Sequence, residues 1–319
     1  MQSTLVAAKG SPRYPVLLAE IQNAPEHLYF KGEPPDMLPP MVAIVGSRNC
    51  SGSAAAIAYR LAGELTALGF CVVSGMAYGI DARAHLGALD AGGKTAAVFG
   101  CGVAVCYPRE HAALMARICE NGAVISEYRP HTPPARQHFP ARNRIISGLA
   151  LGTIIVEARE RSGTFITAAY TREQGRVLMT VSNNALGYAS KGNAQLIEDG
   201  ALAVADGRDV AEAVKDGLAA YRVKREQQIR LCEEKGIDIT AKPSGAAIAA
   251  QASGVKPPSV VEAAILRAIG KKGATLEELV AQTGCTLRDL QCGLTALEIK
   301  QLIRKSHTGC YMSVYAHLK

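Results

Sequence analysis

The sequence predicts an α/β protein: a Rossmann-like, doubly wound and mostly parallel sheet, followed by a small C-terminal winged helix-turn-helix domain. Two patterns support this prediction. From Met41 to Tyr221 short apolar runs alternate with segments of helical periodicity, which is typical of parallel strands joined by right-handed helical crossovers. Beyond Tyr221 the alternation stops, and three helical segments and one apolar strand end the chain.

The alternation opens with a strand, a glycine turn and a helix. The apolar run Val42–Val45 is typical of a strand covered on both faces. It ends at the turn Gly46-Ser47-Arg48. Apolar residues then recur three or four positions apart over 53–68, as in an amphipathic helix: Ile57, Leu61, Leu65 and Leu68. The first N–H groups of such a helix bind anions, and Arg48 adds a permanent positive charge.

Composition limits the class of protein and its surroundings. The 319 residues are enough for one large core and a smaller domain. No apolar run is long enough to cross a membrane and no secretion signal begins the chain, so we expect no membrane insertion. The nine cysteines include no C-x-x-C pair, which indicates reduced thiols and the cytoplasm. The net charge of +7 favours an anionic partner.

Four regions are predicted. Residues 1–40 form a proline-rich N-terminal arm with a short helix over 14–21 and a short edge strand over 27–31. Residues 41–221 form the Rossmann-like domain, and 222–258 a flexible linker that is first charge-mixed and then rich in small residues. Residues 259–319 form the winged-helix domain, with helices over 260–270, 275–283 and 286–303 and a strand over 309–314.

Seven strands are predicted for the Rossmann-like domain: 42–45, 71–74, 95–99, 123–126, 153–157, 177–181 and 202–204. Ligands of parallel sheets bind beyond the carboxyl ends of the strands. Most glycines, hydroxyls and arginines of interest follow these ends, and they are therefore the candidate site: Gly46, Ser47, Arg48, Gly75, Ala77, Gly79, Arg109, Ser162 and Thr164.

The segment 129–147 carries four arginines, one phenylalanine and no acid: Arg129, Arg136, Phe139, Arg142 and Arg144. Basic residues interleaved with an aromatic ring suit single-stranded nucleic acid, because phosphates meet the cations and a base stacks on the ring. The alternative is a solvated proline-rich loop in which Phe139 fills a gap in the core.

Other chemistries have weaker support. The dinucleotide fingerprint is absent, and Gly93-Lys94-Thr95 precedes a strand, so it is no phosphate loop. Asp81 and His85 have the spacing of a pair of metal ligands, but no third ligand lies nearby in the sequence. The simpler interpretation is that Asp81 stabilises the first turn of its helix, while His85 is packed or hydrogen-bonded. Glu157 suits either a general base or an anchor for the helix after Ser162. The sequence shows no set of nucleophile, base and orienting residue, so we expect no catalytic activity, no metal and no cofactor.

Seven segments, in order, resemble the DNA-processing protein A (DprA/Smf) family: 46–48 (GSR), 74–85 (SGMAYGIDARAH), 107–110 (YPRE), 126–127 (SE), 139–149 (FPARNRIISGL), 162–168 (SGTFITA) and 192–201 (GNAQLIEDGA). The C-terminal unit resembles the winged helix that closes many members. The resemblance implies a non-enzymatic, often dimeric protein that binds and protects single-stranded DNA during natural transformation and loads the recombinase RecA onto it.

Carried over, Ser47 and Arg48 would hold a phosphate and Arg136 a second one. Phe139 would meet a base, while Arg142 and Asn143 shape its pocket. Arg109 would extend the positive track. The chain departs from the family at Val181-Ser182-Asn183, where members often have Val-Pro-Gly. Many members carry a helical domain ahead of the YP segment, and we do not expect that domain within these 319 residues.

Two rival functions remain at this point. A nucleotide or nucleoside-phosphate hydrolase on a related fold would use Glu157 with the Ser162-Gly163-Thr164 turn. A transcription regulator would use the winged helix, but there eight lysines and arginines stand against five acids from Ser259 onward. This surplus is small, so we expect that domain to contact protein rather than to bind a duplex.

Overall fold

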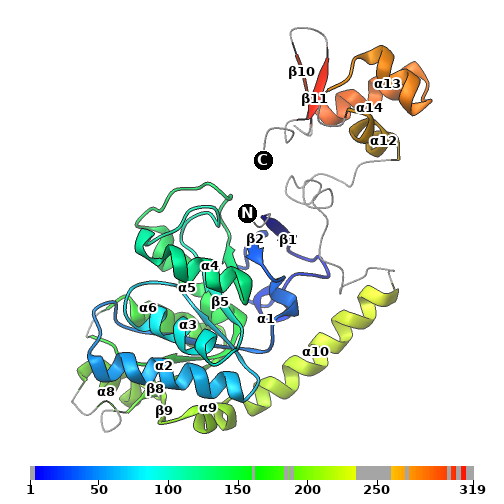
Figure 1. Ribbon diagram of the computed structural model, residues 1–319. Helices are drawn as coiled ribbons and strands as arrows, with labels where there is room; N and C mark the ends of the chain where they lie inside the picture. The colour runs from blue at the N-terminus through cyan, green and yellow to red at the C-terminus, as the bar shows by residue number, and fades with distance from the viewer. Residues whose placement is uncertain are drawn as a thin grey trace. The chain divides into compact units, whose positions relative to one another are not determined.

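The computed structural model of the chain describes residues 4–159, 162–182, 186, 190–234, 260–269, 273–299, 303–306 and 310–313. The chain divides into two compact units, Met1–Lys242 and Pro243–Lys319. The fold class agrees with the prediction: the first unit is a mostly parallel α/β sheet and the second a winged helix (Figure 1).

One sheet runs through the first unit. Its described strands have the order β1-β2-β6-β5-β4-β3-β7-β8-β9. Strands β3 to β9 pair in parallel, whereas β1 and β2 are antiparallel additions next to β6. The strands are β1 (Leu5–Ala8), β2 (His27–Gly32), β3 (Met41–Val45), β4 (Cys71–Ser74), β5 (Thr95–Val98), β6 (Gly122–Ser126), β7 (Ala150–Ile155), β8 (Val177–Val181) and β9 (Leu202–Val204).

Helices cover both faces of this sheet. They are α1 (Val16–Ala19), α2 (Gly52–Ala67), α3 (Ile80–Asp90), α4 (Ala112–Glu120), α5 (His138–Leu149), α6 (Thr164–Glu173), α8 (Lys191–Glu198), α9 (Gly207–Ala213) and α10 (Lys215–Glu234). On one face Ile154 of β7 shares a core with Leu61 of α2. Its neighbour Thr153 faces the other way and accepts a hydrogen bond from Thr171 of α6 (2.9 Å). This alternation is the period-two pleat of a strand.

The strand order places a topological switch point at β3. Strand β4, next in the chain, lies on one side of β3, and β7 lies on the other. The connections that leave β3 and β7 therefore diverge, and they leave a crevice beyond the carboxyl ends of the two strands.

The N-terminal arm differs from its prediction. Strand β2 is no edge strand, because it lies between β1 and β6, with Leu5 opposite Phe30 and Tyr29 opposite Ser126. The unpredicted strand β1 is buried along most of its length. The segment 1–40 is rich in proline, but it also contains two short apolar runs, and these form the strands β1 and β2 that extend the sheet. The arm thus belongs to the first unit.

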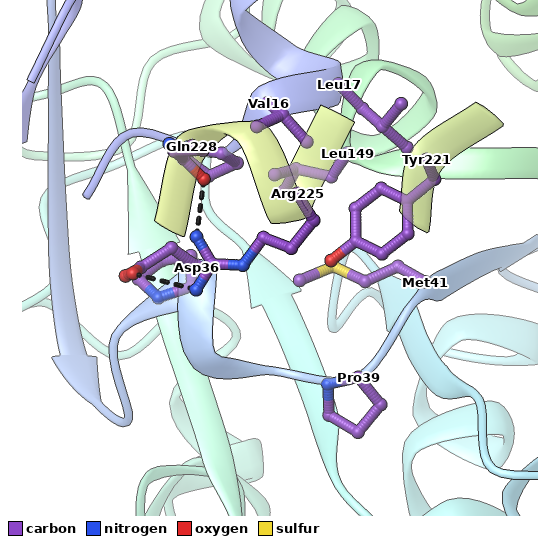
Figure 2. Close-up of a pocket in the computed structure, with 11 residues that line it drawn as sticks. Val16, Leu17, Asp36, Pro39, Met41, Leu149, Tyr221, Arg225 and Gln228 are labelled. Carbon is purple, nitrogen blue, oxygen red and sulfur yellow. Dashed lines mark hydrogen bonds and ion pairs between the residues drawn. The ribbon is translucent and has the colours of Figure 1, made fainter. Parts of the chain in front are cut away.

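The predicted linker also begins too early. Residues 222–234 continue α10, and this helix docks on the arm. Arg225 pairs with Asp36 (3.4 Å), as Figure 2 shows near the half-buried Tyr221. Gln228 Nε2 donates to the carbonyl of Tyr14 (2.8 Å). Because α10 leaves most of its side chains in solvent, its sequence has the mixed charge of a linker. Residues 235–258 lie outside the described ranges.

The second unit has the predicted three helices, α12 (Val260–Ile269), α13 (Leu276–Thr283) and α14 (Leu287–Ile299). Thr275 and Glu278 form a capping box at the start of α13. The third helix is shorter than predicted, because Ile303 begins a strand, β10 (Ile303–Lys305), that pairs antiparallel with β11 (Tyr311–Ser313). The two ends of the strand predicted over 309–314, Gly309 and Val314, lie outside the residues that the structure describes. Among described helices of the chain, none combines the length and apolar character of a membrane span.

One buried side chain ties the carboxyl ends of β7 and β8 together. Asn193, at the start of α8, donates from Nδ2 to the carbonyls of Val156 and Val181 (both 2.9 Å). Its Oδ1 accepts from the N–H of Ala158 (2.9 Å) and from the hydroxyl of Ser190 (2.9 Å). The side chain thus closes the loop that leads from β7 toward Arg159 and α6.

We expect Asn193→Ala to lower the free energy of unfolding by about 3 kcal/mol or more, because it leaves three buried backbone groups without a partner. The measurement is urea denaturation followed by circular dichroism. The matched control is Gln195→Ala, an exposed position on the same helix, which should change stability by less than about 0.5 kcal/mol. Equal midpoints for the two variants would contradict this role for Asn193.

Candidate nucleic-acid interface

A groove with a volume of about 720 Å³ lies at the switch point. Five segments line it: the turn after β3, the loop before α3 with the start of that helix, the loop after β5 that carries Tyr107, α5 with the residues before it, and the loop from β7 with the start of α6. Ten predicted site residues meet here, although they are far apart in the sequence: Gly46, Ser47, Arg48, Ala77, Arg136, Phe139, Arg142, Asn143, Ser162 and Thr164.

Three of the predicted site residues, Gly75, Gly79 and Arg109, do not line the groove. Gly79 has a φ of 74°, and a Cβ there would collide with the carbonyl oxygen of Ser47, so the glycine lets two loops cross. A Cβ at Gly75 would overlap the guanidinium of Arg142. Arg109 is exposed on a 3-10 turn, Arg109–His111, outside the lining of the groove. The two glycines therefore shape the site without facing it.

Arg48 reaches into the groove from the turn after β3. Its side chain is exposed, and its Cζ lies 5.7 Å from the centre of the Phe139 ring, which is a cation–π contact. The turn is held by the N–H of Ser47, which donates to the carbonyl of Glu157 (2.9 Å). The Ser47 hydroxyl donates to the carbonyl of Asn49 (2.9 Å), so Arg48 is the stronger anion contact of the pair.

Arg142 lines the groove but is only 4% exposed. Its guanidinium donates to the carbonyls of Gly75 (2.8 Å) and Val98 and, from Nε, to Oδ1 of Asn143 (3.1 Å). Burial lowers the pKa of Arg142 to about 10, although the nearby Asp81 carboxylate opposes this shift. Arg142 therefore holds α5 against the ends of β4 and β5 and turns the amide of Asn143.

Asp81 and His85, which have the spacing of a metal pair, both have structural roles. Asp81 accepts from the N–H groups of Gly75 (3.2 Å) and Ala77 (3.4 Å), in the loop before α3 rather than in its first turn. Burial raises the pKa of Asp81 against the lowering effect of Arg142. His85 Nδ1 bonds to the hydroxyl of Thr95 (2.7 Å), and burial lowers the pKa of His85 to about 3, so the ring is neutral. Within the described ranges no third ligand completes a metal cluster.

Glu157 does not face the groove. It is 6% exposed, and its Oε2 accepts from the N–H of Ser51 (3.0 Å), the N-cap residue of α2. The sequence allowed Glu157 to be a general base or an anchor of the helix after Ser162, and the observed bond instead anchors the start of α2. Glu157 thus fixes the Arg48 turn from both its carbonyl and its carboxylate.

Arg159 and Tyr107 are two groove residues that were not among the predicted site residues. Arg159 is exposed, lines the groove and donates to the carbonyl of Asn49 (3.2 Å). Tyr107 lines the groove with 45% of its surface exposed. Arg159 could have been found, since it follows a strand end on the same rim. Arg144, by contrast, forms a two-bonded ion pair with Glu127 (2.9 and 2.7 Å) and is largely neutralised.

The electrostatics of the groove favour an anion. Three exposed arginines line it, Arg48, Arg136 and Arg159. Asp81 is the one acid among the described lining residues, and it is buried and bonded to backbone N–H groups. The exposed charge of the groove is therefore positive. Two aromatic rings also line the groove, the half-buried Phe139 and the exposed Tyr107.

This fold and groove define a Rossmann-like protein with an arginine-lined groove at its switch point. The chain belongs to the DNA recombination-mediator protein A family, whose profile matches residues 5–215. The DprA winged helix domain profile matches residues 249–308. The resemblance noted in the sequence is thereby confirmed.

Similar sequences and solved structures support this family assignment. DNA processing protein DprA of Streptococcus pneumoniae is 43% identical over 201 residues, 62% of this chain and 70% of the relative. Protein Smf of Synechocystis is 32% identical over 304 residues, 92% of this chain and 76% of the relative. The S. pneumoniae DprA structure has a TM-score of 0.61 at 40% identity, covering 66% of this chain and 74% of that one. The DprA structure from Helicobacter pylori, which concerns its single-stranded DNA binding mode, has a TM-score of 0.59 at 25% identity, covering 69% and 100%.

Because Arg142 is buried, a charge reversal there should affect stability. Arg142→Glu should lower the free energy of unfolding by about 3–5 kcal/mol, because it buries an unpaired acid beside Asp81. Arg48→Glu alters an exposed turn and should change it by less than about 1 kcal/mol. Urea denaturation of both variants compares them. Similar stability would show that Arg142 is solvated in solution.

Proposed function

We propose that this protein binds single-stranded DNA in the arginine-lined groove, protects DNA that enters during natural transformation and loads RecA onto it for recombination. The observation that carries the proposal is the convergence of Arg48, Arg136 and Arg159 with two aromatic rings at one switch point. Arginines contact phosphates and rings contact bases, and bases are accessible in this way when they are unpaired. The single-stranded DNA binding described for the H. pylori relative supports the same assignment.

Each groove residue then has a role. Arg48 and Arg136 contact phosphates, as the resemblance implied, and Arg159 adds a third contact from the opposite side of the switch point. Phe139 provides the aromatic wall. Arg142 positions Asn143, whose Oδ1 it holds, so that the amide Nδ2 is left to donate.

We propose that the protein acts without catalysis. The described residues lining the groove include neither a histidine nor a glutamate that could serve as a base. Glu157, the base of the rival hydrolase, is engaged at the N-cap of α2. The partners in this proposal are single-stranded DNA, RecA and a second copy of the chain. The location is the cytoplasm, in keeping with nine free thiols.

We expect the intact chain to prefer single strands to a duplex and to bind less tightly as salt rises. If about three to five phosphates are neutralised, the plot of log affinity against log salt should have a slope of about −2 to −3.5. Arg48→Glu should weaken binding strongly and flatten the slope by about 0.7, because one phosphate contact is lost. Fluorescence anisotropy with labelled oligonucleotides at several salt concentrations measures both quantities.

The control for charge is Arg222→Glu, which makes the same change at an exposed position on α10 outside the groove. It should leave the affinity nearly unchanged, whereas an equal loss would show that only net charge matters. Phosphate release from nucleotides and DNA should stay at background, with or without magnesium. Turnover that disappears in Glu157→Ala would establish the hydrolase instead.

The second unit should not be needed for this binding. A chain cut between Lys242 and Pro258 should keep its single-strand affinity within about tenfold, or ~1.4 kcal/mol, because the groove lies wholly in the first unit. The fragment must begin before β1, since β1 and β2 belong to the sheet. Anisotropy titration of residues 1–242 tests this. A folded fragment that binds a hundredfold more weakly would show that the second unit shares the DNA site.

A further inference from the structure

The two rings at the groove are not equivalent. Phe139 is half-buried and has neighbours on several sides. The guanidinium of Arg48 lies over it at 5.7 Å from the ring centre. A Cβ on Gly100 would lie 3.0 Å from its Cδ1, so the backbone at Gly100 approaches the ring closely. Phe139 is therefore held as a part of the wall.

Tyr107 is the ring that solvent reaches. It is 45% exposed, although it lines the groove. Its centre lies 5.3 Å from that of Phe139 at an interplanar angle of 40°, a tilted aromatic pair. Phe139 thus supports Tyr107 from within, and the outer part of the Tyr107 ring is open at the rim.

A second tyrosine provides a comparison. Tyr78 is also 45% exposed, but its hydroxyl donates to Oε2 of Glu110 (2.6 Å), and its ring contacts the edge of His111 at 5.0 Å. Tyr78 does not line the groove. Exposure alone therefore does not single out Tyr107. Its distinguishing features are its place at the arginine-lined groove and the aromatic support beneath it.

We propose that Tyr107 is a nucleobase-stacking subsite at the rim of the groove, with Phe139 as its support. This inference rests on the proposed binding of single-stranded DNA and extends it by one nucleotide position. Any base can stack on a tyrosine, so the subsite tolerates all sequences. Arg109, exposed and two residues further along the chain, is placed to contact the phosphate that follows. The strand would then leave the groove over Tyr107 toward Arg109.

The test compares the intact chain with Tyr107→Ala and Tyr107→Phe. Each is titrated with a short oligothymidylate and with the same backbone carrying abasic sites. We expect Tyr107→Ala to lose about tenfold in affinity for the intact strand, or ~1.4 kcal/mol, within the range known for base stacking. Its loss for the abasic strand should be smaller, because no base is present to stack. Tyr107→Phe should behave like the unchanged chain, and Tyr78→Ala is the matched control.

The comparison separates stacking from a structural effect, since a disturbed groove would weaken both strands alike. Tyr107→Trp gives a second measurement: the chain has no tryptophan, so the new residue reports only on this position, and its emission should be quenched when DNA binds. If the unchanged chain binds but the abasic comparison and the emission show no effect, the subsite is wrong and the proposed function stands. If the unchanged chain binds no single strand, both are wrong.

Discussion

The groove depends on one buried cation. The guanidinium of Arg142 lies where the first turns of α5 meet the ends of two strands, and it donates to the carbonyls of Gly75 and Val98. Burial is costly for a cation, and the carbonyl dipoles and the Asp81 carboxylate offset part of this cost. Since Phe139 and Asn143 lie on the same helix, the orientation of this one side chain sets the position of the aromatic wall and of the donor amide.

The glycines and acids around the groove serve the same end. Gly75 leaves room for the Arg142 guanidinium, and Gly79 lets its loop pass against Ser47. Asp81 and Glu157 bind backbone N–H groups instead of ligand. Thus many residues in the family's motifs make contacts within the protein, and these contacts hold the loops that carry the exposed arginines.

Most of the parallel sheet could be predicted from the sequence, because short apolar runs bounded by glycine are specific to buried strands. Strand ends indicated six residues of the groove, and the basic segment 129–147 with the family resemblance indicated four more. The degree of burial could not be predicted: Arg48 and Arg142 are the same residue type on one rim, yet only Arg142 is desolvated. The Arg144–Glu127 pair joins segments that the sequence separates. Helix α10 was missed because its stability comes from docking on the arm, through Arg225 and Gln228.

The placement of β2 has a consequence for the order in which the chain matures on the ribosome. Its partner β6 is synthesised much later, and so the β1–β2 pair has no further strand to join while the intervening helices form. The groove closes later still, because Asn193 joins the ends of β7 and β8 only after α8 has emerged. Local contacts form before distant ones. A nascent chain therefore completes its groove only after α8 has emerged, and a chain that stops before α8 lacks the Asn193 bonds that join the ends of β7 and β8.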